Sequence, residues 1–129
     1  MKAISYSGWL FTYPLPLFLS PAPQGPGLYS VQVKSGEYWP HPFEPIWFGE
    51  SADLADRSFP SHEAFRRWCL HPAVCAGSLL YISYMHLPFN RRFRTRVEGN
   101  LIARYQPACN LQGGDVPVAL LSAPEPTPG

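Results

Sequence analysis

The sequence predicts an α+β domain in which helices flank a small three-stranded antiparallel sheet. Its 129 residues suit one domain, and its 46% apolar residues are enough for one packed core. Sixteen prolines and ten glycines exclude a coiled coil and predict many loops. The strand-like and helix-like segments follow the order β-β-α-α-β-α, which is typical of helices packed on a single sheet.

Residues 1–26 form a proline-rich N-terminal lead. The apolar run 9–19 resembles part of a signal peptide, but Pro14 and Pro16 would break the helix that such a peptide needs. The run is also too short to span a membrane, so we expect no membrane partner. We instead expect an extended segment that packs residues 9–11 (Trp-Leu-Phe) on the core and then follows the surface.

Three segments predict the strands of the sheet. Residues 27–33 are rich in strand-forming side chains and are followed by a turn signal at 34–37. Residues 38–45 contain three prolines, and we expect them to form a loop that lengthens a hairpin. A second short strand covers 46–49, and the strongest strand pattern covers 78–85.

Two short helices are expected between the second and third strands. Residues 51–57 begin a helix with Ser51 as a plausible cap. Ser61 caps the next helix, and Pro72 ends it. The apolar side chains that share one face of that helix are Phe65, Trp68 and Cys69.

The last helix is expected over 89–105. Apolar side chains recur there every four residues, and Pro107 ends the pattern. The members of this stripe are Phe93, Val97, Leu101, Ile102 and Tyr105. Small residues, glycine and proline dominate residues 112–129, which predicts a flexible C-terminal tail.

Charge and cysteine content favour particular partners and a compartment. Residues 1–65 carry three basic and six acidic side chains, whereas residues 66–129 carry seven arginines and three acids. Such arginines form either a solvated helix face or a surface for a polyanion. Three cysteines cannot all pair internally, which suits a reducing, cytoplasmic setting. Two of them flank a histidine, but no fourth ligand has the spacing of a zinc site.

Four separated blocks share a characteristic order and spacing. Residues 27–29 read glycine-leucine-tyrosine, and residues 47–49 read tryptophan-phenylalanine-glycine. Arg57 follows the second glycine by eight residues, with Leu54 between them. The closing block begins at Glu98, with an aliphatic pair three and four residues later, proline at nine and asparagine at twelve. These blocks resemble the GIY-YIG nuclease family, and the closing block is similar to that of bacterial excision-repair endonucleases.

The resemblance implies a nuclease domain over residues 27–111 with the three-stranded sheet described above. It also implies an endonuclease that hydrolyses DNA phosphodiester bonds by attack of activated water, with one Mg²⁺ or Mn²⁺ as cofactor. Glu98 would hold the metal ion, Arg57 would bind the scissile phosphate as a planar fork, and Tyr29 would polarise the water or act as its base. Each residue also has a structural explanation: an ion pair for Glu98 and for Arg57, and core packing for Tyr29.

Three further residues complete the expected site. Asn110 would brace it through hydrogen bonds to the backbone after Pro107, or would simply cap the helix exit. His62 would shuttle a proton, or would be an ordinary surface histidine. Trp47 stands where the family usually has a tyrosine, and its indole can donate a hydrogen bond but cannot act as a base.

The last helix begins with four arginines, Arg91, Arg92, Arg94 and Arg96, which would contact DNA phosphates flanking the site. A single domain of this kind would cut both strands only as a homodimer or in two steps, and a protein partner would have to supply tight sequence specificity. Two other functions remain open: a catalytically weakened nucleic-acid-binding module, and a structural subunit of a larger assembly.

Overall fold

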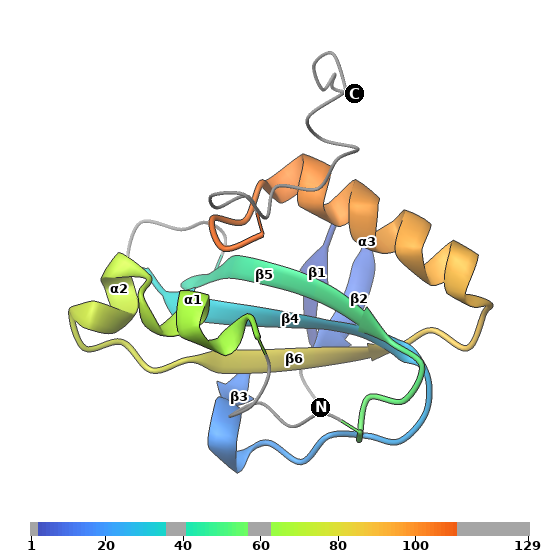
Figure 1. Ribbon diagram of the computed structural model, residues 1–129, viewed down its shortest axis with the longest axis horizontal. Helices are drawn as coiled ribbons and strands as arrows, with labels where there is room; N and C mark the ends of the chain where they lie inside the picture. The colour runs from blue at the N-terminus through green and yellow to red at the C-terminus, as the bar shows by residue number, and fades with distance from the viewer. Residues whose placement is uncertain (1–2, 36–40, 57–62, 111–129) are drawn as a thin grey trace.

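The computed structural model of the chain describes residues 3–35, 41–56 and 63–110. Arg57, Ser61, His62 and the predicted tail over 112–129 lie outside these residues. The fold is α+β, as predicted, with antiparallel pairing between all neighbouring strands (Figure 1). The main sheet has four strands rather than the expected three, and a separate two-stranded sheet accompanies it.

The main sheet is built around β4 (Gly27–Lys34). On one side β4 pairs with β5 (Phe43–Ser51), and on the other side it pairs with β6 (Tyr81–His86). These are the three predicted strands. The fourth strand, β3 (Leu15–Pro16), adds two residues to β6 at the edge, where proline is tolerated. It was missed because the prolines of the N-terminal segment indicate surface chain rather than a strand.

The strand β5 begins earlier than predicted. Residues 43–45 were expected in a loop, but they pair with residues 32–34 of β4. The register shifts between Val31 and Gln32, which is the signature of a bulge. Because β5 lies at an edge of the sheet, Pro45 can take part in the strand opposite Gln32.

The N-terminal segment forms a hairpin instead of an extended lead. Strands β1 (Ala3–Tyr6) and β2 (Trp9–Thr12) are joined by Ser7 and Gly8, both with positive φ, as a two-residue hairpin turn requires. Phe11 is buried and Trp9 packs against the core, as predicted. Leu10 is 64% exposed, contrary to prediction, because successive strand residues point to opposite faces.

The segment after β5 is a turn and not a helix over the described residues 51–56. Ser51 ends β5, and its hydroxyl accepts a hydrogen bond from the Asp53 amide (3.1 Å) and donates one to the Asp53 carbonyl (2.9 Å). This local turn replaces the helix cap that the sequence predicted.

Three α-helices follow in the part of the chain that the structure describes. The helix α1 (Phe65–Cys69) carries the predicted apolar face, with Trp68 fully buried. Pro72 begins α2 (Pro72–Cys75), at the first-turn position that proline favours. The helix α3 (Arg91–Tyr105) starts two residues later than predicted, because the Asn90 side chain caps it by accepting a hydrogen bond from the Phe93 amide. None of the helices in the described ranges is long and apolar enough to cross a bilayer.

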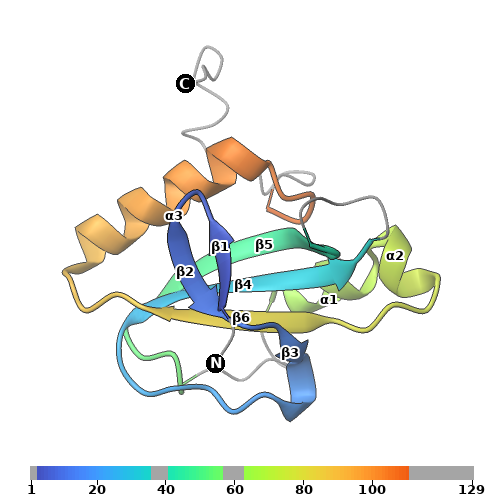
Figure 2. The same cartoon turned by 180° about the vertical axis from the view of Figure 1, so that it is seen from behind.

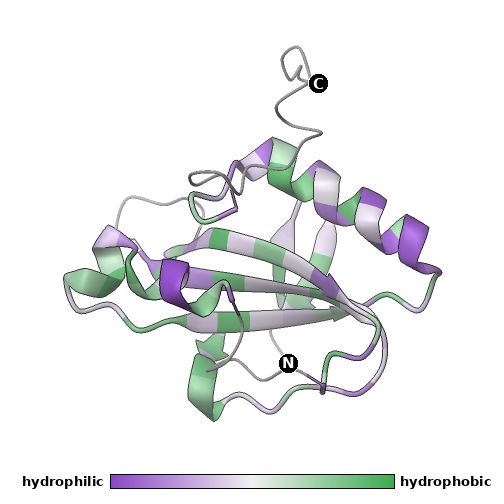
Figure 3. Ribbon diagram, in the orientation of Figure 1, coloured by the Kyte–Doolittle hydropathy of each residue, from purple (hydrophilic) through white to green (hydrophobic). Residues whose placement is uncertain are grey.

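The main sheet separates two apolar layers, which Figures 1 and 2 show from opposite sides. The short 3₁₀ helix η1 (Leu17–Leu19), α1 and α2 cover one face, and the hairpin β1–β2 and α3 cover the other. The predicted stripe of α3 packs into the second layer, whereas its arginine-rich beginning is hydrophilic (Figure 3). The stripe comprises Phe93, Val97, Leu101, Ile102 and Tyr105.

The two strands that carry the first two sequence blocks meet at one close contact. Tyr29 of β4 lies directly opposite Gly49 of β5 in the register of the sheet. The Tyr29 ring crosses over Gly49 so closely that a Cβ there would overlap its Cζ and hydroxyl oxygen. Only glycine at position 49 therefore leaves space for this tyrosine.

We predict that Gly49→Ala lowers the free energy of unfolding by about 3 kcal/mol, because the added methyl group displaces the Tyr29 ring. Denaturant unfolding measures this change. Gly99→Ala is the matched control: Gly99 lies in α3 with open space around it, so alanine there should stabilise the protein by about 0.5–1 kcal/mol. In a Tyr29→Ala background Gly49→Ala should cost less than about 1 kcal/mol. An equal cost in both backgrounds would contradict the assignment.

Candidate functional site

The first two sequence blocks meet through one hydrogen bond as well as through the close packing. The Trp47 indole N–H donates to the Tyr29 hydroxyl oxygen over 3.2 Å. Tyr29 is buried, while Trp47 is only partly buried. The hydroxyl of the buried Tyr29 side chain is thus held in a fixed position beside the partly exposed Trp47 ring.

The helix α1 supports Trp47 from outside the sheet. The Trp68 ring lies 5.9 Å from the Trp47 ring at 65°, an edge-on arrangement. The Arg67 guanidinium lies over the Trp47 ring, 5.9 Å from its centroid, within the range of a cation–π contact. The sequence predicted the buried face of α1 but not these contacts, because no spacing rule says which strand residue a helix touches.

The closing block clamps the outer edge of β5. The Asn110 side-chain oxygen accepts a hydrogen bond from the Phe48 amide (2.8 Å), and its side-chain nitrogen donates to the Phe48 carbonyl (3.1 Å). The Cys109 amide donates to the Ile46 carbonyl over 3.0 Å. Asn110 therefore braces backbone, as expected, but its side chain binds β5 rather than the chain after Pro107.

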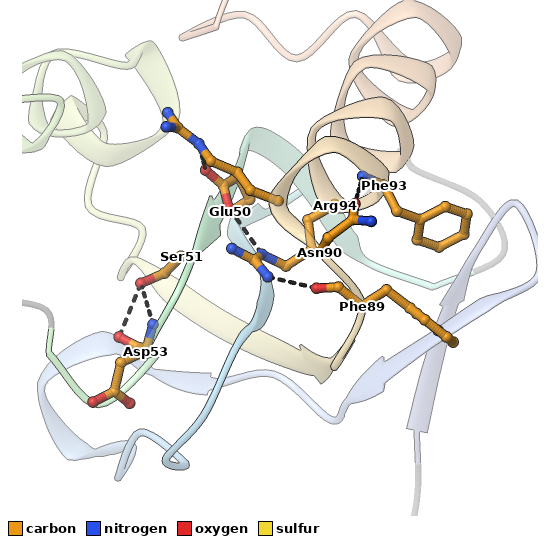
Figure 4. A network of polar contacts seen from close by, with 8 residues as sticks. Glu50, Ser51, Asp53, Phe89, Asn90, Phe93 and Arg94 are labelled. Carbon is orange, nitrogen blue, oxygen red and sulfur yellow. Dashed lines mark hydrogen bonds and ion pairs between the residues drawn. The ribbon is translucent and has the colours of Figure 1, made fainter.

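A charged network connects α3 to the next residue of β5, Glu50 (Figure 4). The Arg94 Nε lies 3.0 Å from one oxygen of Glu50, and the Arg91 Nε lies 3.5 Å from the other. Arg94 also donates to the Phe89 carbonyl over 2.7 Å. Positions 91, 94 and 98 fall on one side of the helix, so Glu98 faces the same group.

The arginines that were predicted to bind substrate fall into two groups, one buried and one exposed. Arg94 is 6% exposed and both of its described contacts are internal, which favours a role in holding Glu50 over direct contact with DNA. Arg91, Arg92 and Arg96 are exposed. Glu50 was not anticipated, although its place two residues after Phe48 puts it on the same strand face.

The environment of Glu98 disfavours its charged form. Burial and, to a smaller extent, the nearby Glu50 charge raise the pKa of the Glu98 carboxyl to about 7, and Arg91 opposes them. A nearby positive charge would favour the ionised form of this carboxyl, and a divalent cation is one group that would supply such a charge. Among the described residues, no cluster of three or more His, Cys, Asp or Glu side chains is arranged to hold a metal. An ion at Glu98 would therefore need water or substrate oxygens as most of its ligands, which suits Mg²⁺.

Contacts with residues 46–50 of β5 thus connect most of the predicted site. Tyr29 contacts this segment through Trp47 and Gly49, Asn110 through Phe48, and α3 through Glu50. Arg57 and His62 lie outside the described residues.

Comparison of the chain with protein-family models, with curated proteins and with solved structures gave no match. The functional argument therefore rests on the residues and their geometry. The resemblance of the four blocks to GIY-YIG nucleases stays a prediction.

We predict that Arg94→Gln lowers the free energy of unfolding by about 2–3 kcal/mol, because among the described residues it leaves the Glu50 carboxylate with one exposed partner, Arg91. Urea unfolding of the two proteins measures the difference. Arg92→Gln removes the same charge at an exposed neighbouring position and should change stability by less than about 0.5 kcal/mol. Equal effects of the two substitutions would show that Arg94 contributes only net charge.

We also predict a pH dependence from Glu98. Its pKa in the folded protein lies above the ordinary value of 4.5, so the folded state holds the proton more tightly. The resulting stabilisation is fully present below that ordinary value and is lost as the pH rises to about 7. In metal-free buffer, wild type should therefore lose about 5 °C of melting temperature relative to Glu98→Gln between about pH 5 and pH 8. Glu63→Gln changes an exposed glutamate and is the control. If the difference in melting temperature between wild type and Glu98→Gln does not change with pH, the prediction is wrong.

Proposed function

We propose that this chain is a GIY-YIG-type endonuclease that hydrolyses DNA phosphodiester bonds with the help of a divalent metal ion. One observation carries the proposal: the tyrosine of the first block lies over the glycine of the second, in direct register. The two short patterns contain Tyr29 and Trp47, which are 18 residues apart in the sequence, and a hydrogen bond between these two side chains joins the patterns.

In this proposal Tyr29 acts on the attacking water. Because its oxygen accepts the Trp47 N–H, negative charge that develops on that oxygen is stabilised. The same bond orients the hydroxyl, whose own proton can then serve a water or a phosphate oxygen. Trp47 supplies only a donor, so general base chemistry falls to Tyr29 alone.

Glu98 is the residue that would hold Mg²⁺ or Mn²⁺. Such an ion, when bound, supplies stabilisation of the charge that builds up on the phosphate. Glu50 adds negative charge next to Glu98, and the buried Arg94 keeps Glu50 in place. Asn110 holds the edge of β5, and the sequence assigns the phosphate fork to Arg57.

The exposed arginines of α3 suit the proposed substrate. Arg91, Arg92 and Arg96 lie on the helix that also carries Glu98. Side chains of this kind bind DNA through phosphates without reading its sequence. We therefore propose a nuclease that has little sequence preference unless a partner or a second copy supplies it.

The decisive test is nicking of supercoiled plasmid DNA with Mg²⁺ or Mn²⁺, and with EDTA as the blank. Tyr29→Phe should lower the nicking rate by about two to four orders of magnitude, because it removes the proposed base and keeps the ring. Glu98→Gln should abolish the metal-dependent rate. Tyr81→Phe, which removes a hydroxyl from the neighbouring strand β6, is the matched control and should keep full activity.

Unchanged activity of Tyr29→Phe would overturn the proposed mechanism. If wild type binds DNA but nicks it with neither metal, while Trp47→Tyr does nick it, the chain is a weakened relative that binds nucleic acid. A protein that neither binds nor cuts DNA would instead fit a structural subunit.

A further inference from the structure

The helix α1 brings a positive charge to the proposed active site. The Arg67 guanidinium lies over the Trp47 ring at 5.9 Å, and the same indole donates its hydrogen bond to the Tyr29 hydroxyl at 3.2 Å. A single side chain therefore separates this cation from the group proposed to activate water. Arg67 is partly buried, so its charge is less screened than that of a fully exposed arginine.

The backbone that carries Arg67 is fixed from two sides. The Cys109 thiol donates to the Arg67 carbonyl over 3.5 Å, which connects α1 to the closing block. The next residue, Trp68, is fully buried and packs edge-on against Trp47. The Arg67 charge also lowers the pKa of the Cys109 thiol against the larger effect of burial, so this charge acts on the closing block.

The position of this guanidinium suits an arginine that binds phosphate. A guanidinium over an aromatic ring is attracted to the π face, and its planar set of five N–H donors matches the oxygens of a phosphate. The contact with Trp47 therefore holds a phosphate-binding group one side chain away from Tyr29. Lysine lacks this planar set of donors but carries the same charge, which supplies most of the affinity for a phosphate.

We propose that Arg67 is a further substrate-binding residue, which contacts a DNA phosphate beside Tyr29 while Trp47 holds its guanidinium. This inference rests on the proposed function for the identity of the ligand. It adds a second cation to the phosphate fork that the sequence assigns to Arg57. It also gives α1 a role in substrate binding that the four sequence blocks do not contain.

The test separates binding from cleavage. We would measure the affinity of a fluorescein-labelled duplex DNA by anisotropy in EDTA, where no metal-dependent cutting occurs. Arg67→Gln should weaken binding about five- to tenfold at about 0.1 M salt and reduce the salt dependence by about one phosphate contact. Arg66→Gln removes the same charge from the exposed neighbouring position of α1 and should weaken binding less than about twofold.

A second variant shows whether Arg67→Gln acts through charge or through lost packing. Arg67→Lys keeps the charge and should recover most of the affinity, and the indole N–H resonance of Trp47 in NMR spectra reports whether the site is intact. No recovery by Arg67→Lys, or equal weakening by Arg66→Gln and Arg67→Gln, would overturn the inference.

The inference and the proposed function can fail separately. DNA binding that depends on Arg67 in a protein that never nicks DNA would support the inference and refute the nuclease. Full nicking activity with unchanged binding in Arg67→Gln would do the reverse. A wild-type protein that does not bind DNA would refute both.

Discussion

The packing of Tyr29 against Gly49 is the constraint on which the site depends. The ring takes the space that any side chain at position 49 would fill, so β4 and β5 can pair in this register only with glycine there. The same register places Trp47 opposite Val31, from where its indole reaches the Tyr29 hydroxyl. One missing Cβ thus permits both the packing of the sheet and the hydrogen bond between Trp47 and Tyr29.

The position of β5 at the edge of the sheet explains why so many parts of the chain converge on it. An edge strand leaves backbone groups unpaired, and these are costly unless something covers them. Here Asn110 and Cys109 satisfy the backbone of Phe48 and Ile46, and Glu50 receives two arginines from α3. Because the closing block and α3 cover this edge, they lie close to Gly49 of β5.

The sequence predicted what local rules determine. The strand-forming side chains of β4 and the four-residue recurrence in α3 identified both elements, and the buried residues of α3 follow the expected stripe. Contacts between distant segments were out of reach: the pairing of β3 with β6, the Arg94–Glu50 ion pair and the cation–π contact of Arg67 with Trp47 involve no fixed spacing. Short polar turns also misled the prediction, because Ser51 satisfies a turn at Asp53 as readily as it would cap a helix.

The tryptophan at position 47 affects its surroundings in two ways. An indole N–H only donates, so the direction of the hydrogen bond to Tyr29 is fixed, whereas two hydroxyls could exchange their roles. The indole ring also contacts α1 through Trp68 and Arg67. In the proposed mechanism, Trp47 therefore leaves proton chemistry to Tyr29, and its ring lies next to a helix that carries a positive charge. The side chain that cannot act as a base thus connects the Tyr29 hydroxyl with the Arg67 guanidinium.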